Sequence, residues 1–202
     1  MLPGILYTAE PGLVIGFHGC DQEVRDSVLA GDEMLRKSVN AYDWLGNGYY
    51  FWQNNFERAL EFARYPPGKQ PCERPAVLGA ILNLGNCLDL TDKKCLISLE
   101  ESFHELRLST RITGKVLPGN KPAADSGELL LRYLDCSVFE YLHVVTEREK
   151  GLPYDSVRGI FVEGKPVFDG AGIYDKTHVQ ICIRNPNCIL GFFLPREAAS
   201  WP

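Results

Sequence analysis

Two short segments about thirty residues apart carry residue types suited to holding a flat organic ligand. His18 and Gly19 end a nearly continuous apolar run, and Tyr50 follows Gly48 in a second apolar run. Glycine lets a ligand approach the backbone closely because it has no side chain, and an aromatic ring offers a face for offset stacking. The two segments therefore predict a site for a flat, partly apolar ligand, and a nicotinamide ring is one such ligand.

The stretch between these segments adds polar and aromatic candidates. Asn40, Asp43 and Trp44 lie in a region rich in turn-forming residues. Loops carried on a rigid scaffold are where binding contacts are concentrated. We expect these three residues to line the ligand site or the entrance for a second substrate.

The composition indicates a globular chain. It has 202 residues, 45% of them hydrophobic and 23% charged, which suits one domain over residues 1–202. The net charge of −5 argues weakly against nonspecific nucleic-acid binding. No apolar run is long enough to span a bilayer and the N-terminus lacks a signal pattern, so a cytoplasmic protein without membrane association is expected.

The cysteines and histidines do not form metal or disulfide patterns. The seven cysteines are an odd number without a Cys-x-x-Cys pair, so we expect reduced, mostly buried thiols. The four histidines are scattered and lack zinc spacing, so no metal site is expected.

Apolar periodicity and capping residues predict an α+β fold. Asp21 is expected to cap a helix that Gly31 ends, Asn54 to cap a second helix, and Pro66 to stop it. The expected strands are 12–18, 47–52, 76–84, 156–163, 178–184 and 189–194, and the expected helices are 21–30, 54–65, 92–110 and 128–148. We expect two packed sheets with helices outside and residues 90–153 as a helical insert.

The motifs His18-Gly19-Cys20 and Gly48-Tyr49-Tyr50-Phe51 resemble those of the ADP-ribosyltransferase superfamily, on its diphtheria-toxin and poly(ADP-ribose)-polymerase side. That family has His-Gly-Ser/Thr at the end of its first core strand and Gly-x-Tyr-Phe on its second. In this chain Cys20 occupies the Ser/Thr position. The resemblance implies a split pair of packed β-sheets with surrounding helices, and NAD⁺ as co-substrate.

The resemblance also implies roles for individual residues. His18 would bind the ribose next to adenine, the backbone of Gly19 would hold the nicotinamide carboxamide, and Tyr50 would stack on the nicotinamide ring. Cys20, Asn40, Asp43, Trp44 and Ala59, the last on the helix after the second motif, are further candidates for NAD⁺ contacts. The third catalytic position, a glutamate in the family, falls on Gln180, with His178 and Glu163 as alternatives.

A glutamine at this position changes the expected chemistry. An amide can bind a ribose hydroxyl, but it cannot act as a base and it offers a dipole in place of a charge. The resemblance therefore implies transfer of a single ADP-ribose to a macromolecular acceptor, protein or nucleic acid, as in a bacterial toxin or defence effector with an antitoxin partner. A catalytically silent NAD⁺-binding module and an NAD⁺ glycohydrolase remain as alternatives.

Overall fold

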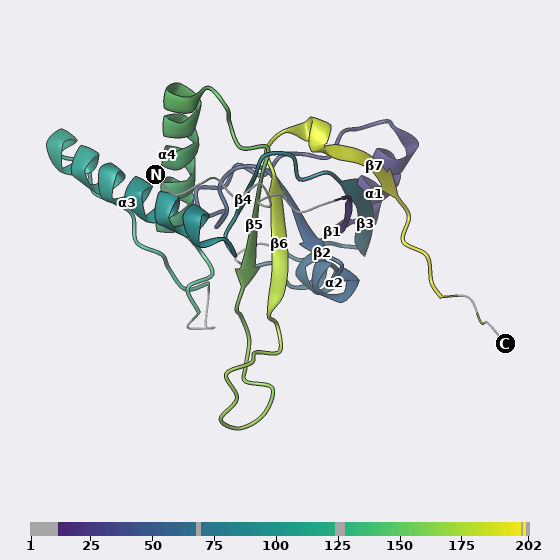
Figure 1. The fold of residues 1–202 in the computed structure, drawn as a ribbon. Helices are drawn as coiled ribbons and strands as arrows, with labels where there is room; N and C mark the ends of the chain where they lie inside the picture. Colours follow the sequence, from purple (N-terminus) through teal and green to yellow (C-terminus); the bar gives the residue numbers. More distant parts are fainter. Residues whose placement is uncertain (1–11, 68–69, 124–127, 199, 201–202) are drawn as a thin grey trace.

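The computed structural model describes residues 12–67, 70–123, 128–198 and 200, which form the predicted mixed α+β fold (Figure 1). The strands are β1 Val14–Asp21, β2 Tyr49–Gln53, β3 Pro75–Leu82, β4 Cys87–Asp89, β5 Ser156–Phe161, β6 His178–Ile183 and β7 Ile189–Phe193. The helices are α1 Gln22–Ala30, α2 Phe56–Arg64, α3 Lys93–Thr113 and α4 Tyr133–Lys150, with a 3₁₀ turn at Pro186–Cys188. The expected insert 90–153 contains α3 and α4, and β4 was not predicted because three residues carry too little periodicity.

The strands form one hydrogen-bonded sheet in the order β4-β5-β6-β2-β1-β3-β7, so the prediction of two packed sheets is wrong. All neighbouring strands are antiparallel except β4 and β5. At the centre of the sheet, however, β1 and β2 share only a short pairing. β1 pairs with β3 along its whole length, whereas β1 and β2 pair only at Gly16–Gln53 and Phe17–Trp52. Beyond Phe17 the two strands part, and this opening lies at the two predicted motifs.

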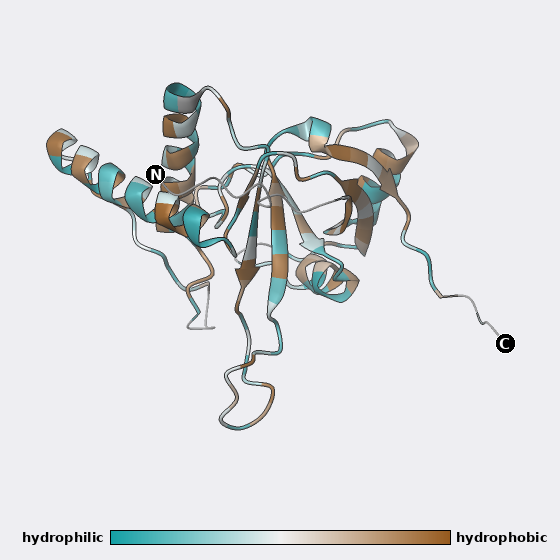
Figure 2. Cartoon of the chain, in the orientation of Figure 1, coloured by the Kyte–Doolittle hydropathy of each residue, from teal (hydrophilic) through white to brown (hydrophobic). Residues whose placement is uncertain are grey.

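Strand alternation divides the side chains between two faces of the sheet. One face carries the core around Phe51, Leu78 and Ile181, against which Val28 of α1 packs. The other face carries two smaller cores, one under α2 and one under α4, which contains Phe139. The space between α2 and α4 on this second face is where the polar residues of β6 emerge, visible in Figure 2 as hydrophilic bands on a hydrophobic strand.

Local capping explains where the helices begin and end. Asp21 caps α1 by accepting from the Glu23 N–H, and Gly31 ends it in the left-handed conformation, both as predicted. The cap of α2 is Asn55 rather than Asn54, because Asn54 adopts a φ of 50° at the end of β2. α4 begins later than predicted, at Tyr133, where Asn120 from the preceding loop accepts from the Leu134 N–H at 2.9 Å.

α3 lies mostly outside the core. Ser102 is the one buried residue of α3. The helix projects away from the sheet in Figure 1. Within the described residues, no helix has the length and apolar character needed to cross a membrane. The seven cysteines are all free thiols.

Candidate functional site

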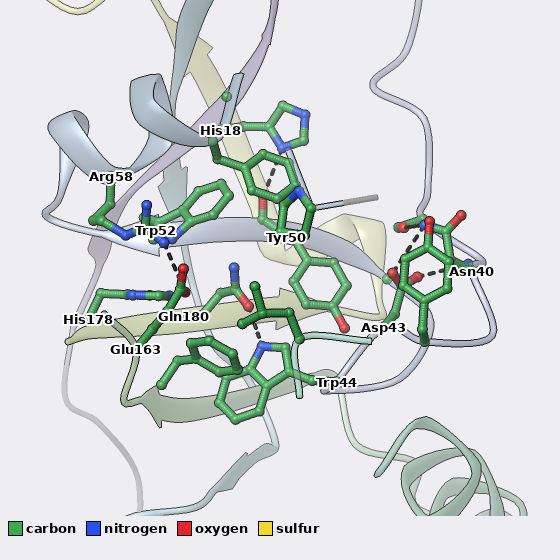
Figure 3. Close-up of a pocket in the computed structure, with 18 of the residues that line it drawn as sticks. His18, Asn40, Asp43, Trp44, Tyr50, Trp52, Arg58, Glu163, His178 and Gln180 are labelled. Carbon is green, nitrogen blue, oxygen red and sulfur yellow. Dashed lines mark hydrogen bonds and ion pairs between the residues drawn. The ribbon is translucent and has the colours of Figure 1, made fainter. Parts of the chain in front are cut away.

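A cavity of about 500 Å³ opens between α2 and the loop 36–44, above β2 and β6. This volume is in the range of small-molecule sites. The residues that line it come from both ends of the chain: His18, Gly19, Arg36, Lys37, Ser38, Val39, Asn40, Tyr42, Asp43, Trp44, Gly48, Tyr50, Trp52, Arg58, Glu61, Phe62, Tyr65, Pro67, Leu130, Leu131, Phe161, Glu163, Lys176, His178 and Gln180. Figure 3 shows Tyr50, Asp43 and Asn40 at one end and Arg58, Glu163 and His178 at the other, with Gln180 between them.

His18 interrupts the ladder between β1 and β2. Its Nδ1 lies 2.8 Å from the carbonyl oxygen of Tyr50, and because a carbonyl only accepts, Nδ1 carries the proton. Burial lowers the pKa of His18, which favours the neutral ring. Nε2 is then unprotonated and able to accept a hydrogen bond from a ligand hydroxyl.

The hydrogen bond between His18 and the Tyr50 carbonyl leaves the backbone of Gly19 without its expected partner on β2. Asn54 N–H donates to the Ile15 carbonyl, so residues 15, 17 and 19 direct their backbone groups toward β2. Continuing the register would place Gly19 opposite Tyr50, but the pairing stops at Phe17 and the Tyr50 carbonyl bonds His18 instead. Among the described residues, the N–H and C=O of Gly19 therefore have no ladder partner on the cavity side.

Glycine at position 19 is also required by the packing of α2. A Cβ built there would lie 2.0 Å from the carbonyl oxygen of Ala59, which is fully buried. Ala59 thus brings α2 against the β1 backbone and does not line the cavity. The prediction that Ala59 contacts the ligand is not supported, and its small side chain serves this close approach.

Tyr50 faces the cavity with its aromatic ring, because its hydroxyl is bonded elsewhere. The hydroxyl donates to the Gly46 carbonyl at 2.7 Å and accepts from the Leu45 N–H at 3.0 Å. Burial is the main reason that the pKa of Tyr50 is raised, so the phenol stays protonated. With its polar atom committed to the preceding turn, Tyr50 offers the cavity an aromatic surface.

Trp44 and Gln180 form one unit. The Trp44 Nε1–H donates to Oε1 of Gln180, and because an indole N–H only donates, the atom facing it must be the amide oxygen. The indole is held edge-on to Phe161 at 4.7 Å and lies close to Gly159, where an added Cβ would be 3.1 Å from it. The amide NH₂ of Gln180 is therefore the group left for a ligand, so position 180 offers donors.

Asn40 and Asp43 close the loop beside Tyr50. Asp43 accepts from the Asn40 backbone N–H at 2.9 Å and from its side-chain amide at 3.1 Å. The loop is tied to the rest of the fold by Glu140 of α4, which accepts from the Asn47 N–H at 2.8 Å and pairs with Arg184 at 2.7 Å. Asp43 thus acts mainly as a turn-forming residue at the cavity wall.

The opposite end of the cavity is charged. Arg58 pairs with Glu163 at 3.0 Å and with Glu61 at 2.8 Å, and Lys176 pairs with Glu61 at 2.6 Å. Burial lowers the pKa of His178 to about 4 and keeps its ring neutral.

The cavity brings together most of the predicted residues, including His18, Gly19, Asn40, Asp43, Trp44, Tyr50, Gln180 and the alternatives His178 and Glu163. Cys20 is not among the residues that line the cavity: its side chain packs into the core with Leu78, where burial raises the pKa of its thiol to about 12. Trp52 and Arg58 were missed. Trp52 lies two residues after Tyr50 on the same strand, so its place on the same face was predictable from the period of a strand.

Trp52 also carries a buried donor without a partner. Its Nε1 and the Nε of Arg58 lack hydrogen-bond partners among the described residues, although both side chains line the cavity. Within the part of the chain that the structure describes, no three His, Cys, Asp or Glu side chains lie close enough together to hold a metal ion. No family model, curated protein or solved structure matches this chain.

Proposed function

We propose that this protein binds NAD⁺ in the cavity and transfers one ADP-ribose to a macromolecular acceptor with release of nicotinamide. The supporting observation is the free backbone of Gly19 beside the ring of Tyr50. An N–H and a C=O on one residue complement the oxygen and the NH₂ of a carboxamide. The neighbouring ring supplies the stacking surface for the pyridine.

The chemistry asked of the site is cleavage of the bond between the ribose C1 and the nicotinamide nitrogen. The bonding electrons leave with nicotinamide, which departs neutral, and positive charge develops on the ribose. His18, through its unprotonated Nε2, would accept from a ribose hydroxyl, and the NH₂ of Gln180 would donate to a ligand oxygen. Neither group is an anion, so the rate should be modest compared with an enzyme that places a carboxylate at position 180.

A second candidate is an NAD⁺-binding module without catalysis. This candidate is favoured because the Gln180 oxygen accepts from Trp44. Gln180 then offers the ligand only its amide protons, which cannot act as a base. A third candidate, an NAD⁺ glycohydrolase, would use water as the acceptor.

The test is to incubate the protein with NAD⁺ labelled in its adenylate part, with and without cell lysate. Nicotinamide release with label on a macromolecule supports the transferase, and release with free ADP-ribose alone supports the glycohydrolase. NAD⁺ binding by calorimetry without release supports the silent module. Absence of NAD⁺ binding would overturn all three.

Variants locate the activity in the cavity. His18→Ala and Tyr50→Ala should abolish NAD⁺ binding or turnover, whereas Tyr141→Phe on α4, outside the cavity, should not. Gln180→Ala should reduce turnover, and an unchanged rate would remove Gln180 from the mechanism.

A further inference from the structure

Glu163 is a carboxylate placed at the charged end of the cavity with one oxygen uncommitted. It follows β5, and its side chain is 12% exposed. Oε2 pairs with Arg58 at 3.0 Å, whereas no partner of Oε1 is found among the described residues. A carboxylate that is nearly buried, oriented by one cation and open on its other oxygen is able to take a proton from a bound group.

Arg58 holds this carboxylate in place. Its two terminal nitrogens bind different partners, Nη2 with Glu163 and Nη1 with Glu61. Lys176 binds the other oxygen of Glu61, so the guanidinium is itself braced from the opposite side. The backbone carbonyl of Glu163 accepts from the Lys176 N–H at 3.2 Å, which fixes the segment that carries the carboxylate.

Burial and the neighbouring charges shift the pKa of Glu163 in opposite directions. Burial is the largest influence and raises its pKa, Arg58 and Lys176 lower it, and Glu128 and Glu61 raise it again. The net result is a pKa above the ordinary value, which makes the group a better base than an exposed glutamate.

The neighbouring groups are weaker bases. His178 donates from Nδ1 to the Lys176 carbonyl at 2.7 Å, and its lowered pKa of about 4 makes its free nitrogen a poor proton acceptor. Gln180 has no basic atom. Glu163 is therefore the best-placed base in this half of the cavity.

We propose that Glu163 is the general base that deprotonates the acceptor nucleophile, with Arg58 as its positioning residue. This inference rests on the proposed function. In the step, Glu163 takes the proton of an acceptor O–H or N–H, the acceptor atom bonds the ribose C1, and the C1–nitrogen bond breaks. The electron pair of that bond leaves on nicotinamide, and Glu163 later returns its proton to solvent. Gln180 would contact the donor nucleotide and Glu163 the acceptor.

The test uses Glu163→Gln with two acceptors of known chemistry, water and azide. The amide retains an oxygen for Arg58 but cannot accept the proton. We expect NAD⁺ binding by calorimetry to be unchanged within about twofold and nicotinamide release in water to fall about 100-fold or more, the usual contribution of a general base. Azide is already an anion and needs no base, so it should restore release from the variant and yield ADP-ribosyl azide.

The pH dependence gives a second readout. In the wild-type protein the rate in water should fall as acid protonates Glu163, and this acid limb should be missing in Glu163→Gln. Asp89→Asn is the matched control, because Asp89 pairs with Arg158 at 2.9 Å in a similarly buried ion pair outside the cavity. Whatever the change in its unfolding transition, the rate of Asp89→Asn per folded molecule should match that of the wild type.

The outcomes separate the inference from the proposed function. If the wild-type protein releases no nicotinamide even when cell lysate is present as the source of acceptor, the proposed function fails and the inference with it. If the wild-type protein is active and Glu163→Gln is equally fast in water, only the inference fails. It also fails if azide does not restore the variant, or if the variant loses NAD⁺ binding, because Glu163 would then serve binding or structure.

Discussion

The pairing of Trp44 with Gln180 predicts a measurable coupling between two residues that are 136 positions apart. Trp44→Phe keeps an aromatic ring against Phe161 but removes the N–H donor, and Gln180→Leu removes the acceptor while keeping a side chain of similar size. Each single change leaves one polar atom inside the protein without its partner. The double variant removes both.

The expected size follows from burial. Gln180 is 8% exposed, so its oxygen gains little from water when the indole N–H is lost. A buried polar group left without a partner costs about 1–3 kcal/mol, whereas removing both partners can be nearly neutral. The two single costs sum to about 2–6 kcal/mol, so the double variant should be more stable than that sum predicts by about the same amount.

The assay is urea unfolding at pH 7 of the wild type, the two single variants and the double variant, followed by circular dichroism. Val28→Ala combined with Trp44→Phe is the control, because Val28 packs on the opposite face of the sheet and the two effects should add. If the Trp44 and Gln180 effects also add to within about 0.5 kcal/mol, the hydrogen bond is not the feature that orients the amide.

Two further predictions concern stability. Burial lowers the pKa of His143 from 6.5 to about 3, and neither ring nitrogen has a partner among the described residues. Protonation therefore favours the unfolded chain, and the stability present above pH 6.5 is lost as the pH falls toward 3. His143→Phe should flatten this loss by up to about 1.4 kcal/mol per pH unit in urea titrations, and an unchanged slope would contradict it. Gly19→Ala should lower the unfolding free energy by about 1–3 kcal/mol or more, because its Cβ would meet the Ala59 carbonyl at 2.0 Å. In thermal melts Gly191→Ala, with open space around it, should change little, and equal melting of the two variants would refute the packing argument.

The parts of the fold that depend on neighbouring residues were predictable from the sequence. The cap at Asp21 and the termination at Gly31 are local events, and the sequence placed both correctly. The cap of α2 was assigned one residue early, because Asn54 and Asn55 are equally good capping residues by type. Only the left-handed backbone of Asn54, which follows from the end of β2, separates them.

The parts that depend on long-range pairing were not predictable. The short pairing at Phe17–Trp52 decides whether the strands form one sheet or two, and no local sequence pattern predicts this pairing. The orientation of the Gln180 amide is likewise decided by an indole on a distant loop. The cluster of His18, Tyr50 and Gln180 in one cavity was anticipated through the family resemblance, whereas the ion pair of Arg58 with Glu163 was not.

The parting of β1 from β2 gives this protein a strand edge in the middle of its sheet. Exposed strand edges ordinarily invite pairing with other chains and favour aggregation. Here α2 lies against Gly19, and the loop that carries Trp44 bonds Gln180 of β6, so the open position has protein on both sides. The open ladder position of Gly19 therefore faces a cavity of about 500 Å³ instead of the outer edge of the sheet, where unpaired strand groups meet other chains.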